Sequence, residues 1–544
     1  MVSSDCNDRS FREHLKRQLN DKQTVLIIII GSFIYAVLDT IGEEIENSNE
    51  LIIHDFLCSL PIKLFLSFTL LTMITTALPF FLKRRRHLIQ KTSYCSTLKV
   101  FFLLLLCWLP MFLIEYPGSF MYDTQRQAFQ IATGHYDAFH PLLHTLLLRL
   151  CLSVYPLVQS IEKCAVLYSI LQMLLLAGCF ALTCKILNQI IRNRSFYTTC
   201  VLFYGLYPAH MAMACNYIKD VLFAGLFSLY VALNLKQSLT QDNKKFTLVW
   251  IIICGSLVCL LRNNMIYAMA LWAIILLFAK HKRRFLSAVL SIILACSVNE
   301  AMIFSLRAER GSIVEMLSVP IQQLSRVRIL MPDSFSEQEK VVFDSVFTNE
   351  GWRNYEPTLS DPVKADISEE KLIENKSALA HLWFSIGLRN PKAYFDALFH
   401  LILPSIYPYR NYNVAQPYIE TGLQPGVLTA PFGQQQMKQP SRFKRIREWL
   451  NVEIYSTGAN HIPVLRWIMN SGLVFWFLFL CLLIVFLYGG VSRYTLLLAL
   501  CLYGTYLLGP VMQGRYLYPF VCVIPHFIMS AVIAAKGEKE YAQS

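Results

Sequence analysis

The fold of this chain is decided by residues 98–141, which read LKVFFLLLLCWLPMFLIEYPGSFMYDTQRQAFQIATGHYDAFHP. Residues 98–114 are apolar and nearly long enough to cross a hydrocarbon core about 30 Å thick. The polar loop that follows carries two Asp, two His and one Arg before the next apolar run begins. Because ionisable groups are costly near a bilayer, this clustering predicts a site that handles a polar substrate.

The composition indicates an integral membrane protein. Hydrophobic residues make up 55% of the 544 positions and charged residues only 16%, far from the balance of an average soluble protein. The net charge of +13 does not predict a nucleic-acid partner, because the Lys and Arg residues lie in short clusters beside apolar runs. That placement is typical of the cytoplasmic ends of membrane spans.

The apolar runs predict an all-α polytopic membrane protein with about twelve transmembrane helices. Flanking charges place both termini in the cytoplasm and the loop around Asp123 outside the cell membrane. The apolar segment 142–155 is short and bounded by prolines, so an interfacial helix is expected there. The expected spans lie near residues 24–41, 60–82, 98–114, 163–186, 195–214, 221–235, 246–261, 265–279, 286–304, 467–488, 494–512 and 516–535.

This pattern divides the chain into three parts. Residues 1–304 form an N-terminal transmembrane module, whose exterior loop 115–162 carries the candidate chemistry. Residues 305–466 are polar and rich in proline, which predicts a mostly helical and irregular extracytoplasmic domain. Residues 467–544 return to transmembrane helices. The 16 cysteines are scattered, mostly inside apolar runs, and predict no disulfide framework.

Asp123 is the candidate catalytic residue. It precedes Gln127 by four positions, so a helix over 122–133, ended by Gly134, places both side chains on one face. Apolar neighbours on both sides are expected to raise the pKa of Asp123 and to suit it to proton transfer near neutral pH. The competing interpretation is that the polar residues of this loop only cap helices and bind water.

Asp137 and His140 precede Pro141, which is suited to starting a helix, so either residue could cap that helix or contact a substrate. His135, His140 and His144 could instead form a metal site, since the last two are one helical turn apart. Pro141 lies inside that pair and no fourth ligand has a typical spacing. Packing and hydrogen bonding are therefore favoured, and no cofactor is expected, with a divalent metal as the alternative.

Three cations from separate segments are expected on the same membrane face as Asp123, namely Lys219, Arg262 and Arg515. An Arg in the apolar region costs about 2.5–3.5 kcal/mol unless it is paired. A shared anion explains the three placements together, and a lipid phosphate or pyrophosphate is the anion that a membrane face offers. For Lys219 the alternatives are an ion pair with the adjacent Asp220 or snorkelling to the interface.

The order and common sidedness of these motifs resemble the GT-C superfamily, whose members are multi-spanning glycosyltransferases with an acidic residue in the first large exterior loop. More narrowly, the pattern is similar to that of an uncharacterised bacterial multi-spanning family. The resemblance covers most of the chain. The matching residues are Pro117-Gly118, Asp123, Gln127, Gly134, His140-Pro141, Lys219-Asp220, Arg262-Asn263, Ser318-Val319-Pro320-Ile321-Gln322-Gln323 with Arg326, and Arg515-Tyr516.

The resemblance implies an inverting transfer from a polyprenyl-phosphate sugar donor to an extracytoplasmic glycan, lipid or protein of the cell envelope. Asp123 would be the base that activates an acceptor hydroxyl. The chain has Tyr122-Asp123 where many relatives have two adjacent acids, which argues against a metal-dependent mechanism. The expected substrate-binding residues are Gln127, Asp137, His140, Lys219, Asp220, Arg262, Asn263, Gln322, Arg326, Arg515 and Tyr516.

Two other functions stay open at this point. A polymerase or ligase of lipid-linked glycans also uses outer-face cations and a long exterior loop, and differs in its oligosaccharide donor. A transporter or flippase of a lipid-linked or anionic substrate usually places its charges near the bilayer midplane and shows repeated halves. Here the charges are expected at one face and no repeat is visible, which disfavours transport. The resemblance implies a hexosyl- or pentosyltransferase.

Overall fold

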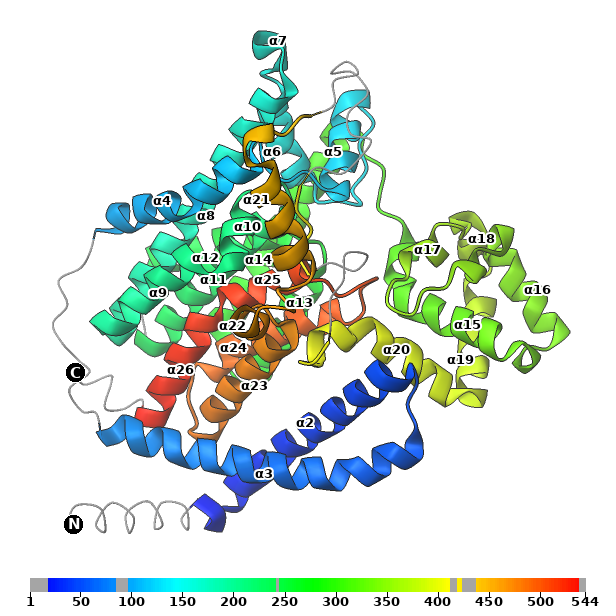
Figure 1. The fold of residues 1–544 in the computed structure, drawn as a ribbon, viewed down its shortest axis with the longest axis horizontal. Coiled ribbons are helices and arrows are strands. Elements are labelled where there is room, and N and C mark those ends of the chain that lie inside the picture. Colours follow the sequence, from blue (N-terminus) through cyan, green and yellow to red (C-terminus); the bar gives the residue numbers. More distant parts are fainter. Residues whose placement is uncertain (1–17, 85–95, 241–243, 411–417, 423–436, 538–544) are drawn as a thin grey trace.

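The computed structural model of the chain describes residues 18–84, 96–240, 244–410, 418–422 and 437–537. Across these ranges the chain is built from helices and the segments that connect them (Figure 1). Extended backbone pairs only in isolated bridges there, such as the one between Ser119 and Asn216. The prediction of an all-α protein is confirmed, with no sheet in the described ranges.

Two long helices, α2 (Lys22–Ser48) and α3 (Ile53–Arg84), pack against each other at one end of the molecule (Figure 1). Helix α2 begins after Asp21, whose side chain accepts hydrogen bonds from two first-turn N–H groups. It ends at Asn49 in the left-handed conformation, with φ 58°. This end of α2 packs against a helix from a distant part of the chain, described below.

A bundle of apolar helices forms the main core. Its most enclosed member is α11 (Lys219–Thr240), which packs against α8 (Ile161–Ile191), α12 and α25. The other helices that contribute to this core are α4 (Thr97–Glu115), α9 (Arg194–Leu206), α10 (Pro208–Ala214), α12 (Lys245–Leu261), α13 (Asn264–Phe278), α14 (Lys282–Leu306), α23 (Ser471–Leu487), α24 (Arg493–Tyr506), α25 (Gly514–Cys522) and α26 (Ile524–Lys536).

The structure contains fewer helices of spanning length than the twelve that the sequence predicts. Six helices in the described residues are long and apolar enough to cross a membrane, namely α2, the Ile53–Ala77 part of α3, α4, α8, α11 and α14. The pair α25 and α26, bent by 41°, would make a seventh. Prolines explain part of the difference, because Pro208 and Pro525 each start a new helix inside an apolar run.

The loop after α4 folds into three short helices, α5 (Tyr122–Thr133), α6 (Leu142–Leu152) and α7 (Tyr155–Val158). The predicted helix 122–133 is confirmed, and Gly134 ends it in the left-handed region with φ 74°. Helix α6 follows Pro141 without a side-chain cap, so neither Asp137 nor His140 caps it. It packs on α5 and α8.

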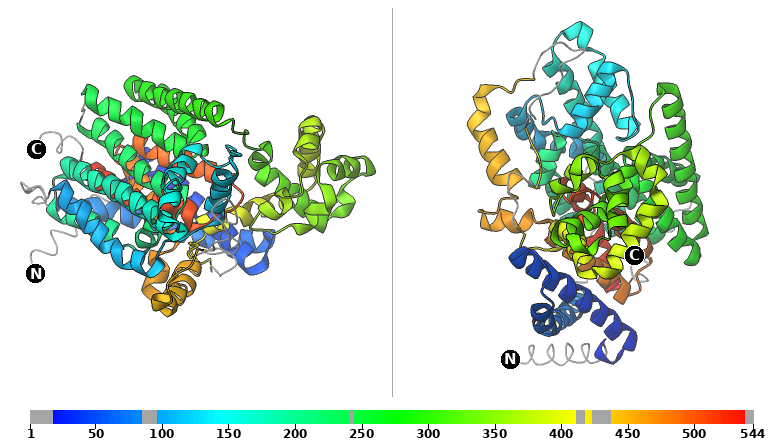
Figure 2. Two further views of the ribbon diagram at one scale, coloured as in Figure 1. Left: turned by 90° about the horizontal axis from the view of Figure 1, so that it is seen from above. Right: turned by 90° about the vertical axis from the view of Figure 1, so that its right-hand side faces the viewer.

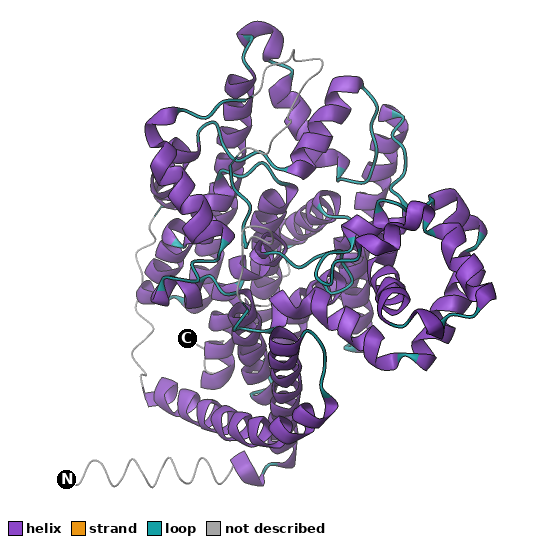
Figure 3. Ribbon diagram, turned by 45° about the vertical axis from the view of Figure 1, so that its right-hand side comes forward, coloured by secondary structure: helices purple, strands orange, loops and turns teal. Residues whose placement is uncertain are grey.

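A group of short helices stands to one side of the bundle (Figures 1 and 2). Its apolar residues between 314 and 394 form a hydrophobic cluster of their own, and Figure 3 shows the short helices of this group beside the bundle. The predicted bounds of an exterior domain, 305–466, stay a prediction. The helices of this group are α15 (Ser318–Leu330), α16 (Glu337–Val346), α17 (Asp361–Lys364), α18 (Glu369–Glu374) and α19 (Lys376–Arg389).

Helix α20 (Pro391–Ile406) leads from this group back to the bundle, where it packs against α2 and α23. Apolar side chains of α2 and α20 form a small cluster between the two helices. Further along the chain, α21 (Lys444–Trp449), a π-helical turn at Leu450–Ser456 and α22 (Pro463–Ile468) lead into α23.

Candidate functional site

Backbone hydrogen bonds join two distant segments at the site. The Ser119 N–H donates to the Cys215 carbonyl at 2.8 Å, and the Tyr217 N–H donates to the Ser119 carbonyl at 2.9 Å. The Thr124 hydroxyl donates to the Tyr217 carbonyl. These bonds hold the first turn of α5 beside the first turn of α11, so the polar loop and the most enclosed span meet at one point.

Asp123 lies between two cations. Its Oδ2 atom is 2.5 Å from Lys219 Nζ and 3.4 Å from a guanidinium nitrogen of Arg515, and the three side chains are 17%, 12% and 13% exposed. His140 completes the group, with Nδ1 3.1 Å from Lys219 Nζ. We call these four residues the Asp123 site. Within these four residues two cations face one carboxylate, and Glu420 adds a further negative charge near Arg515.

The surroundings of Asp123 and His140 determine the protonation states of these two side chains. Burial alone would raise the pKa of Asp123, but Arg515 and Lys219 hold it well below its usual value of 3.8. The predicted rise in the pKa of Asp123 is therefore wrong: its sequence neighbours are apolar, but its spatial neighbours are cations. Burial, with Lys219 nearby, lowers the pKa of His140 well below 6.5, so this imidazole is neutral and its Nδ1 accepts from the ammonium group.

Hydrogen bonds fix the orientation of Arg515. Its Nε donates to Gln513 Oε1 at 2.9 Å, and a terminal nitrogen donates to the Tyr516 hydroxyl at 3.0 Å. Gln513 in turn donates to a carboxylate oxygen of Glu420 at 3.2 Å, and the Glu420 carbonyl accepts from the Asn216 side chain at 2.8 Å. The start of α25 is thereby tied to the segment that precedes Lys219.

Arg262 has a partner of its own. It forms an ion pair with Asp220, whose side chain is fully buried. Its guanidinium group lies over the rings of Tyr506 and Tyr516, 4.4 and 4.9 Å from their centres. Asp220 therefore pairs with Arg262 and not with its neighbour in sequence, and the cost of burying Arg262 is offset without a bound anion. Arg515 lies 4.8 Å from the centre of the same Tyr516 ring, so both guanidinium groups contact this residue.

Gln127 points away from the Asp123 site into a buried polar network. Its amide nitrogen donates to the Thr145 hydroxyl at 2.8 Å, and its oxygen lies 2.8 Å from His144 Nδ1. His144 Nε2 is 2.6 Å from the Tyr168 hydroxyl, which donates to Gln172 at 3.3 Å. Both ring nitrogens of His144 and the polar end of Gln127 are thus engaged within the protein, which favours a structural role for Gln127.

The far end of this network supports the segment before Lys219. The Gln172 side chain donates to the Asn216 carbonyl at 2.8 Å and to the Ala214 carbonyl at 3.1 Å. Sequence analysis did not single out Tyr168 or Gln172. Their signal is a pair of polar residues four positions apart inside an apolar span, a spacing that places both on one face of the helix.

The alternative metal site at His135, His140 and His144 is not formed. His144 is enclosed by Gln127 and Tyr168, and His140 faces an ammonium group. Within the ranges that the structure describes, no group of three or more His, Cys, Asp or Glu residues could hold a metal ion.

Asp137 and Asn263 lie beside the site and not in it. Asp137 pairs with Arg126 at 3.1 Å and accepts from the Phe139 N–H at 3.0 Å. The Asn263 side chain donates to the Ala138 carbonyl at 3.3 Å. The two residues shape the loop that ends at His140.

Gln322 and Arg326 lie on α15, and their contacts belong to another region. Gln322 is buried and donates to the Glu356 carbonyl at 2.6 Å. Arg326 donates to the Tyr355 hydroxyl and lies 3.6 Å from Asp396. The structure brings Asp123, His140, Lys219 and Arg515 together, with Tyr516, Arg262 and Asp220 adjoining them, and it places Gln322 and Arg326 apart.

The apolar helices define the chain as a multi-span helical membrane protein. Residues 132–544 match a family described as "Family of unknown function (DUF6020)", and the chain belongs to that family. No curated protein and no solved structure matches it.

Proposed function

We propose that this protein is a GT-C-like glycosyltransferase of the cell membrane. In this proposal it moves a hexosyl or pentosyl group from a polyprenyl-phosphate donor to an extracytoplasmic acceptor of the cell envelope. The observation that carries the proposal is the meeting of one carboxylate with two cations from separate segments, all three largely buried. A phosphate monoester or diester is the ligand that best fits two such cations.

The donor phosphate would bind by taking over the partners of Asp123. Lys219 supplies a compact charge, and Arg515 supplies a planar fork that Gln513 and Tyr516 already orient. In the resting protein Asp123 is a weak base, because both cations lower its pKa. When the phosphate draws these cations toward itself, the pKa of Asp123 rises and the carboxylate becomes a better proton acceptor.

The chemical step then follows from this arrangement. The acceptor hydroxyl gives its proton to Asp123 while its oxygen attacks the anomeric carbon of the sugar. The bond between that carbon and the phosphate oxygen breaks, and polyprenyl phosphate leaves with an additional negative charge. Lys219 and Arg515 stabilise this charge as it develops. Attack opposite the leaving group inverts the configuration at the sugar.

The remaining residues would position this machinery. Neutral His140 accepts a hydrogen bond from Lys219 and so fixes the direction of the ammonium group. Arg262, paired with Asp220, packs on the Tyr516 ring and so supports the residue that binds Arg515. In the proposed topology both termini are cytoplasmic, and residues 305–466 and the Asp123 site lie outside, where lipid-linked donors and envelope acceptors meet. No step requires a metal.

The test compares the envelope glycans of source cells that carry the wild-type gene, a deletion, or the deletion complemented by Asp123→Asn. Mass spectrometry should show one sugar missing in the deletion strain and restored by the wild type. Asp123→Asn should lower the restored amount at least about a hundredfold, because the loss of a general base costs roughly 10²–10⁴ in rate.

The matched control is Asp137→Asn, which removes a carboxylate that pairs with Arg126 outside the Asp123 site. It should restore the sugar at the wild-type level when membrane amounts are equal. An Asp123→Asn protein that restores the sugar fully would remove the proposed base. A missing unit of several sugars, transferred from a pyrophosphate carrier, would indicate a polymerase or ligase instead.

A further inference from the structure

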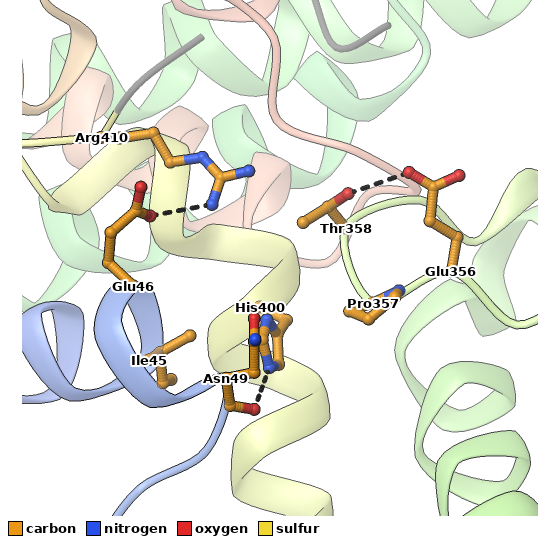
Figure 4. Close-up of a pocket in the computed structure, with 8 residues that line it drawn as sticks. All are labelled: Ile45, Glu46, Asn49, Glu356, Pro357, Thr358, His400 and Arg410. Carbon is orange, nitrogen blue, oxygen red and sulfur yellow. Dashed lines mark hydrogen bonds and ion pairs between the residues drawn. The ribbon is translucent and has the colours of Figure 1, made fainter. Parts of the chain in front are cut away.

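A cavity lies at the end of α2, and none of the four residues of the Asp123 site lines it. Its volume is about 260 Å³, at the small end of ligand pockets. Four separate segments line it: the last turn of α2, helix α20, the segment after α20 and the loop at residues 356–358 (Figure 4). Its polar lining residues are Glu46, Asn49, Glu356, Thr358, His400 and Arg410.

The walls of this cavity are held by contacts that need no ligand. His400 Nε2 lies 2.8 Å from the Asn49 carbonyl, and Arg326 donates to the same carbonyl at 3.3 Å. Arg410 lies 3.1 Å from Glu46 (Figure 4). Next to the cavity, α2 and the end of α20 approach each other closely, since a Cβ on Gly42 would lie 2.4 Å from the Tyr407 ring. The cavity is therefore a built feature of the α2–α20 junction.

The lining chemistry disfavours a charged ligand. Glu46 and Glu356 contribute two carboxylates, and Arg410 contributes one cation. Burial lowers the pKa of His400, so its imidazole adds no charge near neutral pH. An anion would meet two negative groups. Glu46 pairs with Arg410, and Glu356 accepts from the Thr358 hydroxyl at 3.3 Å, so both carboxylates have partners that a bare cation would have to displace.

The same lining suits a ring that carries several hydroxyl groups. Carboxylate and hydroxyl oxygens of Glu46, Glu356 and Thr358 can accept from such groups, and donors at Arg410 can bind their oxygens. Ile45 and Pro357 offer apolar surface for the C–H faces of the ring. A pocket of this size holds one sugar ring and not a longer glycan.

A short connection joins this cavity to the Asp123 site. Gln322 donates to the carbonyl groups of Glu356 and Leu359, which fixes the lining loop on α15. The next residue, Ser360, donates its N–H to the Pro510 carbonyl at 3.0 Å. Pro510 lies in the segment that leads to Arg515. The loop that closes the cavity thus contacts the segment that carries a cation of the Asp123 site.

We infer that this cavity binds one uncharged sugar residue of the acceptor glycan, held by Glu46, Glu356, Thr358 and Arg410. The inference rests on the proposed function, because it assigns the cavity to the acceptor of that transfer. It also gives Gln322 a role, as the residue that positions the cavity loop, which its separation from Asp123 would otherwise leave unexplained.

The test uses saturation-transfer-difference NMR on the full-length protein in detergent. The probes are glucose, galactose, mannose, N-acetylglucosamine, rhamnose and arabinose, each as the free sugar and as its methyl glycoside. At least one methyl glycoside should give ring-proton signals. Glu356→Gln should weaken that binding at least about tenfold, the effect of losing a hydrogen bond to a charged group. Thr358→Phe, which fills the cavity, should abolish it.

Two control variants separate the possible results. Glu300→Gln removes an exposed carboxylate that pairs with Arg310 and does not line the cavity. This variant should keep the ring-proton signals of the bound sugar. Lys219→Met should also keep them while abolishing sugar transfer in cells. If Lys219→Met still transfers sugar, the proposed role of Lys219 on the donor phosphate fails, while sugar binding by the cavity is judged separately from the NMR signals.

Three results would overturn the assignment itself. They are the absence of signals from every probe, signals that persist in both Glu356→Gln and Thr358→Phe, and binding of free sugars with rejection of all methyl glycosides. The last result would identify a site for a free sugar and not for a residue within a glycan.

Discussion

Replacing Asp123 by Asn should tighten the binding of polyprenyl phosphate while it abolishes transfer. In the resting protein the carboxylate occupies the two cations that we assign to the donor, at 2.5 Å from Lys219 and 3.4 Å from Arg515. A phosphate that binds the same cations must approach this carboxylate closely. Asn keeps the shape of the side chain and removes its charge.

The magnitude follows from the distances. Two like charges about 4 Å apart repel by about 4 kcal/mol at an effective dielectric constant of about 20. Solvent screening is considerable here, because each of the three side chains retains some exposure. Measured couplings of close charge pairs begin at about 1.5 kcal/mol, which corresponds to a tenfold change in affinity. We therefore expect the Kd for undecaprenyl phosphate to fall at least about tenfold in Asp123→Asn.

The assay is a titration of undecaprenyl phosphate into purified protein in lipid nanodiscs, followed by calorimetry. Without ligand, Asp123→Asn should unfold at a lower temperature than the wild type, because two buried cations lose their counter-charge. Saturating undecaprenyl phosphate should remove most of that difference. Asp137→Asn is the matched control and should leave the Kd unchanged. An unchanged or higher Kd in Asp123→Asn would refute the assignment of Lys219 and Arg515 to the donor phosphate.

Two further predictions concern the neighbours of this site. Arg262→Met should destabilise the protein by about 3–5 kcal/mol, since it leaves the buried Asp220 carboxylate unpaired. In thermal unfolding, adding Asp220→Asn to this variant should restore much of the lost stability. A double variant no more stable than Arg262→Met would contradict the pairing. Because the pKa of His140 lies below its ordinary value of 6.5, the stability that its neutral form contributes is complete above about pH 6.5 and is lost as the pH falls toward the folded-state pKa. Between about pH 7 and pH 5 the wild type should therefore lose more thermal stability than His140→Gln, and equal losses would show that His140 does not titrate as the structure implies.

Local features of the loop could be predicted from the sequence because their causes are local. Gly134 ends α5 where expected, since a left-handed residue after a helical stretch favours glycine. The sequence predicted that Lys219, Arg262 and Arg515 lie near Asp123, from flanking charges and from the cost of unpaired cations near lipid. Lys219 and Arg515 contact Asp123, whereas Arg262 pairs with Asp220. The sequence predicted that these residues lie at the same membrane face, but it could not predict the distances between them.

The pairing of individual residues could not be predicted, because it depends on which helices pack together. Asp220 lies next to Lys219 in the chain, yet α11 and the segment after α12 pack so that Asp220 meets Arg262. The pKa of Asp123 was predicted in the wrong direction for the same reason. Its apolar neighbours in sequence say nothing about two cations supplied by distant segments. The number of full spans also depends on helix breaks that hydropathy does not reveal.

In the proposed mechanism, the ion pair between Asp123 and its two cations would keep the donor site stable before the donor binds. Two buried cations with no counter-charge would each cost several kcal/mol, and Asp123 supplies the missing charge when the site is empty. A bound donor phosphate would supply the same charge and would leave Asp123 without strong partners. The substrate itself would then convert a structural carboxylate into a base, so that proton transfer becomes favourable only when the sugar to be transferred is present.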